Sequence, residues 1–104
     1  MAVLGDSERS ERLSELPGWR YEVGTRAIAR RYRFRDFSEA FGFMARAALA
    51  AEEADHHPDW SNSWNRVDVA LTTHSAGGVT ERDFALAARL DAIAASLAEA
   101  GPGD

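Results

Sequence analysis

Polar and apolar side chains alternate in two stretches of the chain, and this pattern predicts the sheet. Over residues 26–35 apolar residues occupy one face of an extended strand and arginines the other, and residues 66–73 alternate in the same way. Each stretch has a shorter neighbour, at residues 19–23 and 59–63, across a short turn. Segments so close in sequence pair as antiparallel hairpins, so the pattern predicts two β-hairpins.

Apolar residues recur at helical spacing in three other stretches. A short helix is expected over residues 7–16, ending before a Pro-Gly pair. Asp36 and Thr80 are suited to cap two longer helices, the first of which should stop near Asp55 or His56, just ahead of a proline. The stripes expected to face the core are Phe37, Phe41, Met44 and Ala48 in the earlier helix, and Leu86, Leu90, Ile93 and Leu97 in the later one.

The elements follow one another as helix, two strands, helix, two strands, helix. Three one-sided helices are most simply laid on one face of a single sheet. We therefore predict an α+β fold of two layers, in which a four-stranded antiparallel sheet carries three helices on one face in the order α-β-β-α-β-β-α. The length suits a single domain over residues 1–104, with residues 1–6 and 101–104 expected to fray.

Composition excludes several classes of function. The chain has no cysteine, which rules out a disulfide framework, a thiolate zinc site and a cysteine nucleophile. Its net charge of -5 disfavours binding to the phosphate backbone of nucleic acid, and neither a membrane-spanning stretch nor a secretory signal is expected. We therefore expect a cytoplasmic protein that binds a small ligand or another protein.

All three histidines lie between Glu52 and His74. His56 and His57 leave the second helix just before a proline, and His74 follows the last strand. Asp83 stands in the first turn of the last helix, on its apolar side. The ends of three elements can thus bring three imidazoles and a carboxylate together, and imidazole suits proton transfer near neutral pH.

Other interpretations of these residues remain open at this point. Each histidine taken singly is typical of a surface or capping position, and the three together could form a metal site that activates water, although adjacent histidines chelate awkwardly. A domain that only binds a partner is a third alternative. Trp19 and Trp60 are candidates to stack on a flat ring, although tryptophan in so small a domain normally packs in the core. Glu52, four residues before His56, is either half-exposed or part of the site.

Four motifs give the chain a resemblance to a known family. They are Glu52-x-x-x-His56-His57-Pro58, Trp64-Asn65-x-Val67, Leu71-Thr72-Thr73-His74, and Gly78-Val79-Thr80-x-x-Asp83 with Leu86-Ala87. In this order and spacing they resemble the pterin-4a-carbinolamine dehydratases, and Gly18-Trp19 with residues 30–37 is similar to the N-terminal half of that family. Two departures are mild, because Trp64 stands where tyrosine is usual and Val79 where leucine is common.

The resemblance implies a hydro-lyase, 4a-hydroxytetrahydrobiopterin dehydratase. Such an enzyme converts 4a-hydroxytetrahydropterin to quinonoid dihydropterin in tetrahydropterin recycling, after aromatic amino acid hydroxylation. It implies no metal and no organic cofactor, since the pterin is the substrate, and it implies homodimers or homotetramers of the two-layer fold. The alternative is a non-catalytic interaction module, because the animal enzyme also serves as a dimerisation cofactor for a homeodomain transcription factor.

The active-site residues of the family fall on four positions of this chain. We expect His56 and His74 to exchange protons with the substrate and His57 to hold or polarise the pterin. Asp83 is expected to orient an imidazole. Further substrate contacts are expected from Glu52, Trp19, Trp60, Thr72 and Thr73, the last two through hydrogen bonds to the ring edge.

Overall fold

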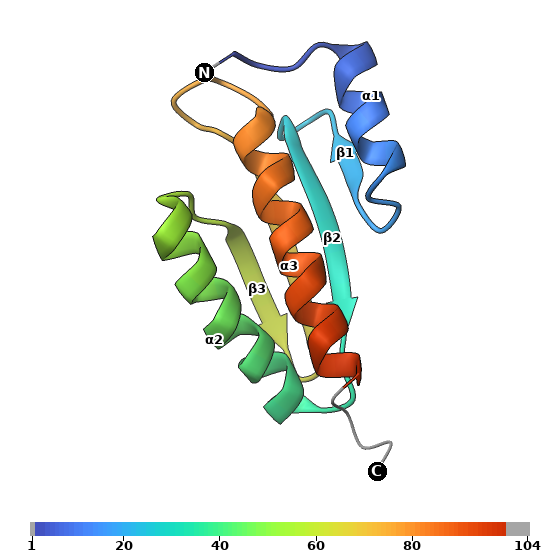
Figure 1. Cartoon of the computed structure of the whole chain (residues 1–104), viewed down its shortest axis with the longest axis vertical. Coiled ribbons are helices and arrows are strands. Elements are labelled where there is room, and N and C mark those ends of the chain that lie inside the picture. Colours follow the sequence, from blue (N-terminus) through green and yellow to red (C-terminus); the bar gives the residue numbers. More distant parts are fainter. Residues whose placement is uncertain (1, 100–104) are drawn as a thin grey trace.

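A computed structural model describes residues 2–99 of the chain (Figure 1). The elements follow in the predicted order and confirm the α+β fold. They are α1 (Asp6–Ser14), β1 (Arg20–Glu22), β2 (Ala27–Arg33), α2 (Phe37–Ala54), β3 (Asp59–Ser63), β4 (Arg66–Leu71) and α3 (Glu81–Glu99). None of the helices within residues 2–99 is long and apolar enough to cross a membrane.

The four strands form one antiparallel sheet in the order β1-β2-β4-β3. The register of the central pair places Ile28 opposite Leu71 and Tyr32 opposite Val67, so these four side chains share one face. Helices α2 and α3 lie side by side over that face, and α1 packs beside β1 (Figure 1). Within residues 2–99 the opposite face of the sheet carries no helix.

The core lies between the sheet and the two long helices. Its sheet side consists of fully buried aliphatic residues and one tyrosine, and its helix side includes Phe43 of α2 and Leu90 of α3. Full burial of one such side chain stabilises the fold by roughly 1.5–3 kcal/mol. The sheet side comprises Ile28, Tyr32, Val67, Val69 and Leu71.

The predicted buried stripe of α2 is wrong. Phe37 and Phe41 are 48% and 58% exposed, and the helix instead buries Phe43 together with small residues. Alanines let the helix axis approach its neighbours closely, and the single Phe43 fills the remaining volume. The buried small residues of α2 are Ala40, Ala47, Ala50 and Ala51.

The N-terminal segment does not fray as expected. Leu4 is buried in the core, and its backbone N–H donates to the carbonyl oxygen of Val79 at 2.9 Å. This contact ties the start of the chain to the loop before α3. The other segment expected to fray, residues 101–104, lies outside the described residues.

Candidate active site

All three histidines line one hollow of about 250 Å³ at the end of the molecule where α2 and β4 end and α3 begins. Histidines at the C-terminal exit of α2 meet a histidine that follows β4, beside the first turn of α3. The predicted convergence of three chain segments is therefore present. The hollow is lined by Asp55, His56, His57, Thr72, Thr73, His74, Ser75 and Arg82.

The exit from α2 directs the two adjacent histidines differently. Asp55 adopts the left-handed conformation (φ 51°, ψ 44°), a common helix C-cap geometry, and the His56 N–H donates back to the carbonyl oxygen of Ala51 at 3.0 Å. As a result His56 is only 8% exposed, whereas His57 is exposed.

The His56 ring is held by a buried carboxylate. Its Nε2 lies 2.5 Å from Oδ1 of Asp83, a side chain with 0% exposure. The second oxygen of Asp83, Oδ2, accepts hydrogen bonds of 2.8 Å from the Thr80 N–H and from the Thr73 hydroxyl. Because an ionised carboxylate only accepts, Nε2 of His56 carries the proton of this bond, and Nδ1 is the ring nitrogen left for a ligand.

The other two histidines also have carboxylate neighbours, but in water. Nε2 of His57 lies 2.6 Å from Oε1 of Glu52, and Nε2 of His74 lies 3.5 Å from Oδ2 of Asp59, with all four side chains exposed. Exposed ion pairs contribute roughly 0–1 kcal/mol. Both rings can therefore turn at little cost when a ligand enters.

The positions of the described side chains do not favour the alternative that the histidines form a metal site. Within residues 2–99, no three side chains of the His, Cys, Asp and Glu types gather closely enough to hold an ion. Each imidazole has instead a carboxylate neighbour of its own. The arrangement is suited to proton transfer by separate histidines.

The hydroxyls of both predicted threonines are engaged by the protein. Thr72 donates to the carbonyl oxygen of Arg26 at 2.7 Å, and the buried Thr73 donates to Asp83. The acceptor of Thr73 stands in the first turn of α3, and the acceptor of Thr72 is a backbone carbonyl just before β2. Both hydroxyl protons are thus used within the protein, and the hydrogen bonds expected from Thr72 and Thr73 to the ring edge stay a prediction, since both residues line the hollow.

Trp19 lies away from the histidines, contrary to its predicted contact with the substrate. It is buried in the core, and its Nε1 donates to Oδ1 of Asp91 at 3.0 Å. Asp91 is eight residues beyond Asp83 on α3, which corresponds to about 12 Å along the helix. Trp60, the other predicted stacking residue, is half-buried on β3, packs against the core, and does not line the histidine hollow.

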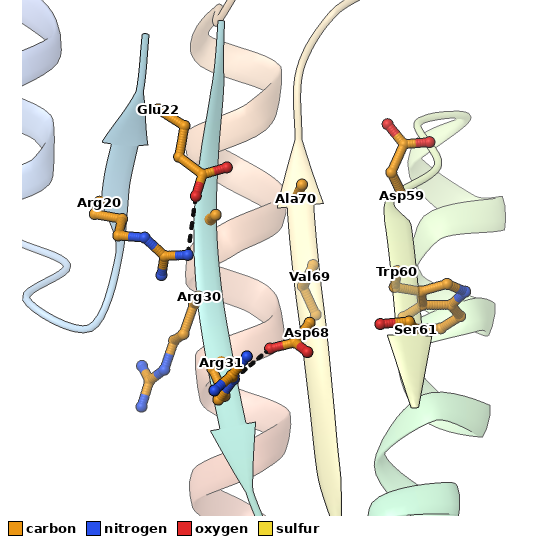
Figure 2. Close-up of a pocket in the computed structure, with 11 residues that line it drawn as sticks. Arg20, Glu22, Arg30, Arg31, Asp59, Trp60, Ser61, Asp68, Val69 and Ala70 are labelled. Carbon is orange, nitrogen blue, oxygen red and sulfur yellow. Dashed lines mark hydrogen bonds and ion pairs between the residues drawn. The ribbon is translucent and has the colours of Figure 1, made fainter. Parts of the chain in front are cut away.

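A second hollow, of about 260 Å³, lies on the helix-free face of the sheet (Figure 2). Four of its charged residues are already paired, since Arg20 bonds Glu22 within β1 at 2.9 Å and Arg31 of β2 bonds Asp68 of β4 at 2.7 Å. The hydrogen bond from Arg31 lowers the pKa of the Asp68 carboxyl. No histidine lines this hollow, so it lacks the proton-transfer groups of the first one.

Three residues near the histidines were not predicted from the sequence to belong to the site. Asp59 could have been found from the hairpin register, which pairs it with Ala70 and so brings it near the end of β4. Thr80 was expected only to cap α3. Arg82 gave no sequence signal, yet its guanidinium donates to the carbonyl oxygens of Ala54 and Asp55 at 3.1 and 2.5 Å and so closes the end of α2 beside His56.

Known proteins resemble the chain over most of its length. The profile of the family described as pterin 4 alpha carbinolamine dehydratase matches residues 2–93. A protein of Rhizorhabdus wittichii is 56% identical over 91 residues, covering 88% of this chain and 94% of its own, and one of Rhodopseudomonas palustris is 58% identical over 94 residues, covering 90% and 93%. Both carry the provisional name pterin-4-alpha-carbinolamine dehydratase.

Solved structures agree with the profile. The crystal structure of a transcriptional coactivator/pterin dehydratase from Brucella melitensis matches with a TM-score of 0.86 and 55% identity, over 88% of this chain and 98% of that one. A pterin dehydratase-like protein identified as a RuBisCO assembly factor in the alpha-carboxysome matches with a TM-score of 0.65 and 27% identity, over 74% and 89%. The family profile and the relatives thus cover both the fold and the histidine hollow, and the chain belongs to the pterin-4-alpha-carbinolamine dehydratase family.

Proposed function

We propose that this protein dehydrates 4a-hydroxytetrahydropterin to quinonoid dihydropterin by histidine acid/base catalysis. The observation that carries the proposal is the hollow lined by three histidines, one of them bonded through Nε2 to the buried Asp83. Membership of the dehydratase family supports the reaction class. The proposal adds the substrate and the roles of the individual residues.

The reaction needs two proton movements on neighbouring atoms of the ring. The bond between C4a and its hydroxyl oxygen breaks as that oxygen gains a proton and leaves as water. The proton on N5 is lost as a double bond forms between C4a and N5. One acid and one base placed on the two atoms satisfy both requirements, and positioned groups of this kind contribute about 10²–10⁴-fold each.

We assign these two proton movements to His56 and His74. His56 exchanges its proton through Nδ1, because Asp83 occupies its Nε2. His74 is exposed, so after each turnover it can exchange its proton with water. His57, paired with Glu52, holds or polarises the ring.

No cofactor takes part in the reaction as proposed. The pterin is itself the substrate, and both proton movements are within the chemistry of imidazole. Metal analysis of the purified protein tests this point. Stoichiometric zinc that is required for turnover would contradict it.

The proposal is tested by supplying freshly made 4a-carbinolamine and following its ultraviolet decay. Wild-type protein should accelerate the decay, and His57→Ala and His74→Ala should each lower turnover by about 10²-fold or more. Asp68→Asn, on the helix-free face of the sheet, is the matched control and should keep the wild-type rate. Near-normal turnover in both histidine variants would refute the assignment.

A second candidate function is a non-catalytic interaction module. It is favoured by the solved neighbours, one of which is described as a transcriptional coactivator as well as a pterin dehydratase, and another as a RuBisCO assembly factor. The carbinolamine assay separates the two candidates. Wild-type protein that leaves the spontaneous decay unchanged would favour the interaction module.

We further propose that the protein forms homodimers or homotetramers through the outer side of α2. Phe37, Phe41 and Leu49 are exposed on this helix, and the two phenylalanine rings pack with centroids 5.9 Å apart. Contiguous exposed apolar residues are typical of association surfaces. Phe41→Glu should lower the molar mass in light scattering, whereas Val23→Glu, at an exposed position in the β1–β2 turn, should not. An unchanged mass in Phe41→Glu would refute this surface.

A further inference from the structure

Behind Asp83 lies a second layer of buried hydrogen bonds. The Thr73 hydroxyl oxygen is 2.8 Å from Oδ2 of Asp83 and 2.7 Å from the hydroxyl oxygen of Thr80. Thr73 is 3% exposed and Thr80 is 0% exposed. Together with His56 these residues form a continuous chain of four side chains that extends from the interior to the hollow.

The direction of every bond in this series of side chains follows from Asp83, which lies inside it and only accepts. Asp83 accepts as a carboxylate, so the single hydroxyl proton of Thr73 is used on Oδ2. Thr73 therefore has no proton for Thr80, and Thr80 must donate to Thr73. The Thr80 hydroxyl proton is available for this bond, because in its contact with the backbone N–H of Arg82, at 3.2 Å, the Thr80 oxygen accepts.

We propose that Thr73 and Thr80 are positioning residues for His56, acting through Asp83. Thr80 fixes the hydroxyl of Thr73, Thr73 fixes the carboxylate plane of Asp83, and Asp83 holds the Nε2 proton of His56. The bonds from Thr80 to Thr73 and from Thr73 to Asp83 run in one direction and polarise one another, so together they fix the orientation of the carboxylate that His56 meets from the other side. The chain thereby holds the imidazole with Nδ1 directed to the ligand, at the atom on which the proposed dehydration depends.

This role differs measurably from that of a substrate contact. Loss of a group that binds the pterin equally in the ground state and the transition state raises KM and leaves kcat unchanged. Loss of a group that positions the imidazole lowers kcat instead. The kinetic experiment rests on the proposed function, and a spectroscopic experiment on the free protein does not.

The kinetic experiment compares Thr73→Val and Thr80→Val with the conservative Thr73→Ser. Thr73→Val removes a bond to a charged group and should lower kcat about tenfold with little change in KM, and Thr80→Val about threefold. Thr73→Ser keeps the hydroxyl and should restore most of kcat. Because both residues act through Asp83, the double variant should lose less than the product of the single losses.

The spectroscopic experiment observes the imidazole N–H of His56 by proton and ¹⁵N NMR in the full chain without ligand. The wild type and Thr73→Ser should show a protected Nε2–H resonance, and Thr73→Val should broaden it by faster exchange with solvent. An unchanged resonance in folded Thr73→Val, or an effect on KM alone, would overturn the proposal. If the wild type did not dehydrate carbinolamine, the NMR comparison would still show whether Thr73 positions the imidazole of His56 through Asp83. If Thr73→Val did not fold, Thr80→Val would carry both measurements.

Discussion

Asp91, near the middle of α3, joins this helix to β2 and to the segment before β1, and replacing it with asparagine tests that junction. Its Oδ1 accepts from Trp19 Nε1 at 3.0 Å, from an Arg30 guanidinium nitrogen at 2.9 Å, and from the Tyr32 hydroxyl. Trp19 and Tyr32 are almost fully buried. Asp91→Asn keeps the shape and one acceptor oxygen but removes the charge.

The expected loss can be worked from these three bonds. A hydrogen bond to a charged group contributes about 1.5–3 kcal/mol and a neutral one about 0.5–1.5, so each of the two buried donors loses about 1 kcal/mol. The partly exposed pair with Arg30 adds at most about 1 kcal/mol. We expect a total of about 2–3 kcal/mol, which lowers Tm by about 10–20 °C in a domain of this size.

Calorimetry and the carbinolamine assay together check this prediction. Asp68→Asn breaks an exposed ion pair with Arg31 and serves as the control, with an expected loss below about 1 kcal/mol. Because Asp91 lies about 12 Å along α3 from Asp83, kcat of folded Asp91→Asn should stay within about twofold of the wild type. A Tm shift below about 4 °C would refute the stabilising role of Asp91. A large loss of kcat in fully folded Asp91→Asn would instead place Trp19 and Asp91 in the active site.

Three further predictions concern single residues. Burial and the hydrogen bond to Asp91 raise the pKa of Tyr32 above its ordinary value of 10.0. The contribution of Tyr32 to stability is therefore complete below pH 10.0 and is lost as the pH rises past that value. In urea unfolding, the free energy of unfolding should fall less between about pH 9 and pH 11 in Tyr32→Phe than in the wild type. Gly77 has φ +84° in the loop before α3, and the new Cβ of Gly77→Ala would meet no neighbour within 4 Å. Backbone strain alone should therefore lower the free energy of unfolding by about 1 kcal/mol, measured by thermal unfolding. Glu52→Gln should leave Tm within about 2 °C but lower kcat/KM severalfold, because the exposed pair with His57 contributes little to stability; an unchanged kcat/KM would exclude Glu52 from the site.

The sheet was predictable because its signal is local. Alternation over β2 and β4 has a period of two that helices cannot produce, and the short turns dictate antiparallel pairing. The buried side of α2 was not predictable in the same way. This helix carries two apolar faces, one with Phe37 and Phe41 and one with Phe43 among alanines, and only packing against α3 and the sheet decides which is buried.

The candidate site was predictable as a set of residues but not as a set of contacts. The three histidines and Asp83 stand at element ends that the topology brings together. The sequence could not indicate that Thr73 bonds Asp83 or that Trp19 bonds Asp91, because both are contacts between side chains from segments that only the folded chain brings into reach. Hydrogen-bonding residues inside a domain depend on tertiary packing, which local patterns do not encode.

The burial of the three carboxylate–histidine pairs divides the site into a fixed half and an adaptable half. His56 is held by a carboxylate that has two further donors and no exposure, so its ring nitrogen is oriented before any ligand arrives. His57 and His74 are exposed, and their pairs cost little to break. A flat substrate can therefore be placed against the fixed imidazole while the other two turn to meet it, and expelling water from around them on binding strengthens their interactions with the ring. Substitutions behind Asp83 should therefore damage the preorganisation of the buried pair, whereas substitutions of the exposed carboxylates Glu52 and Asp59 should mainly weaken the placing of the substrate.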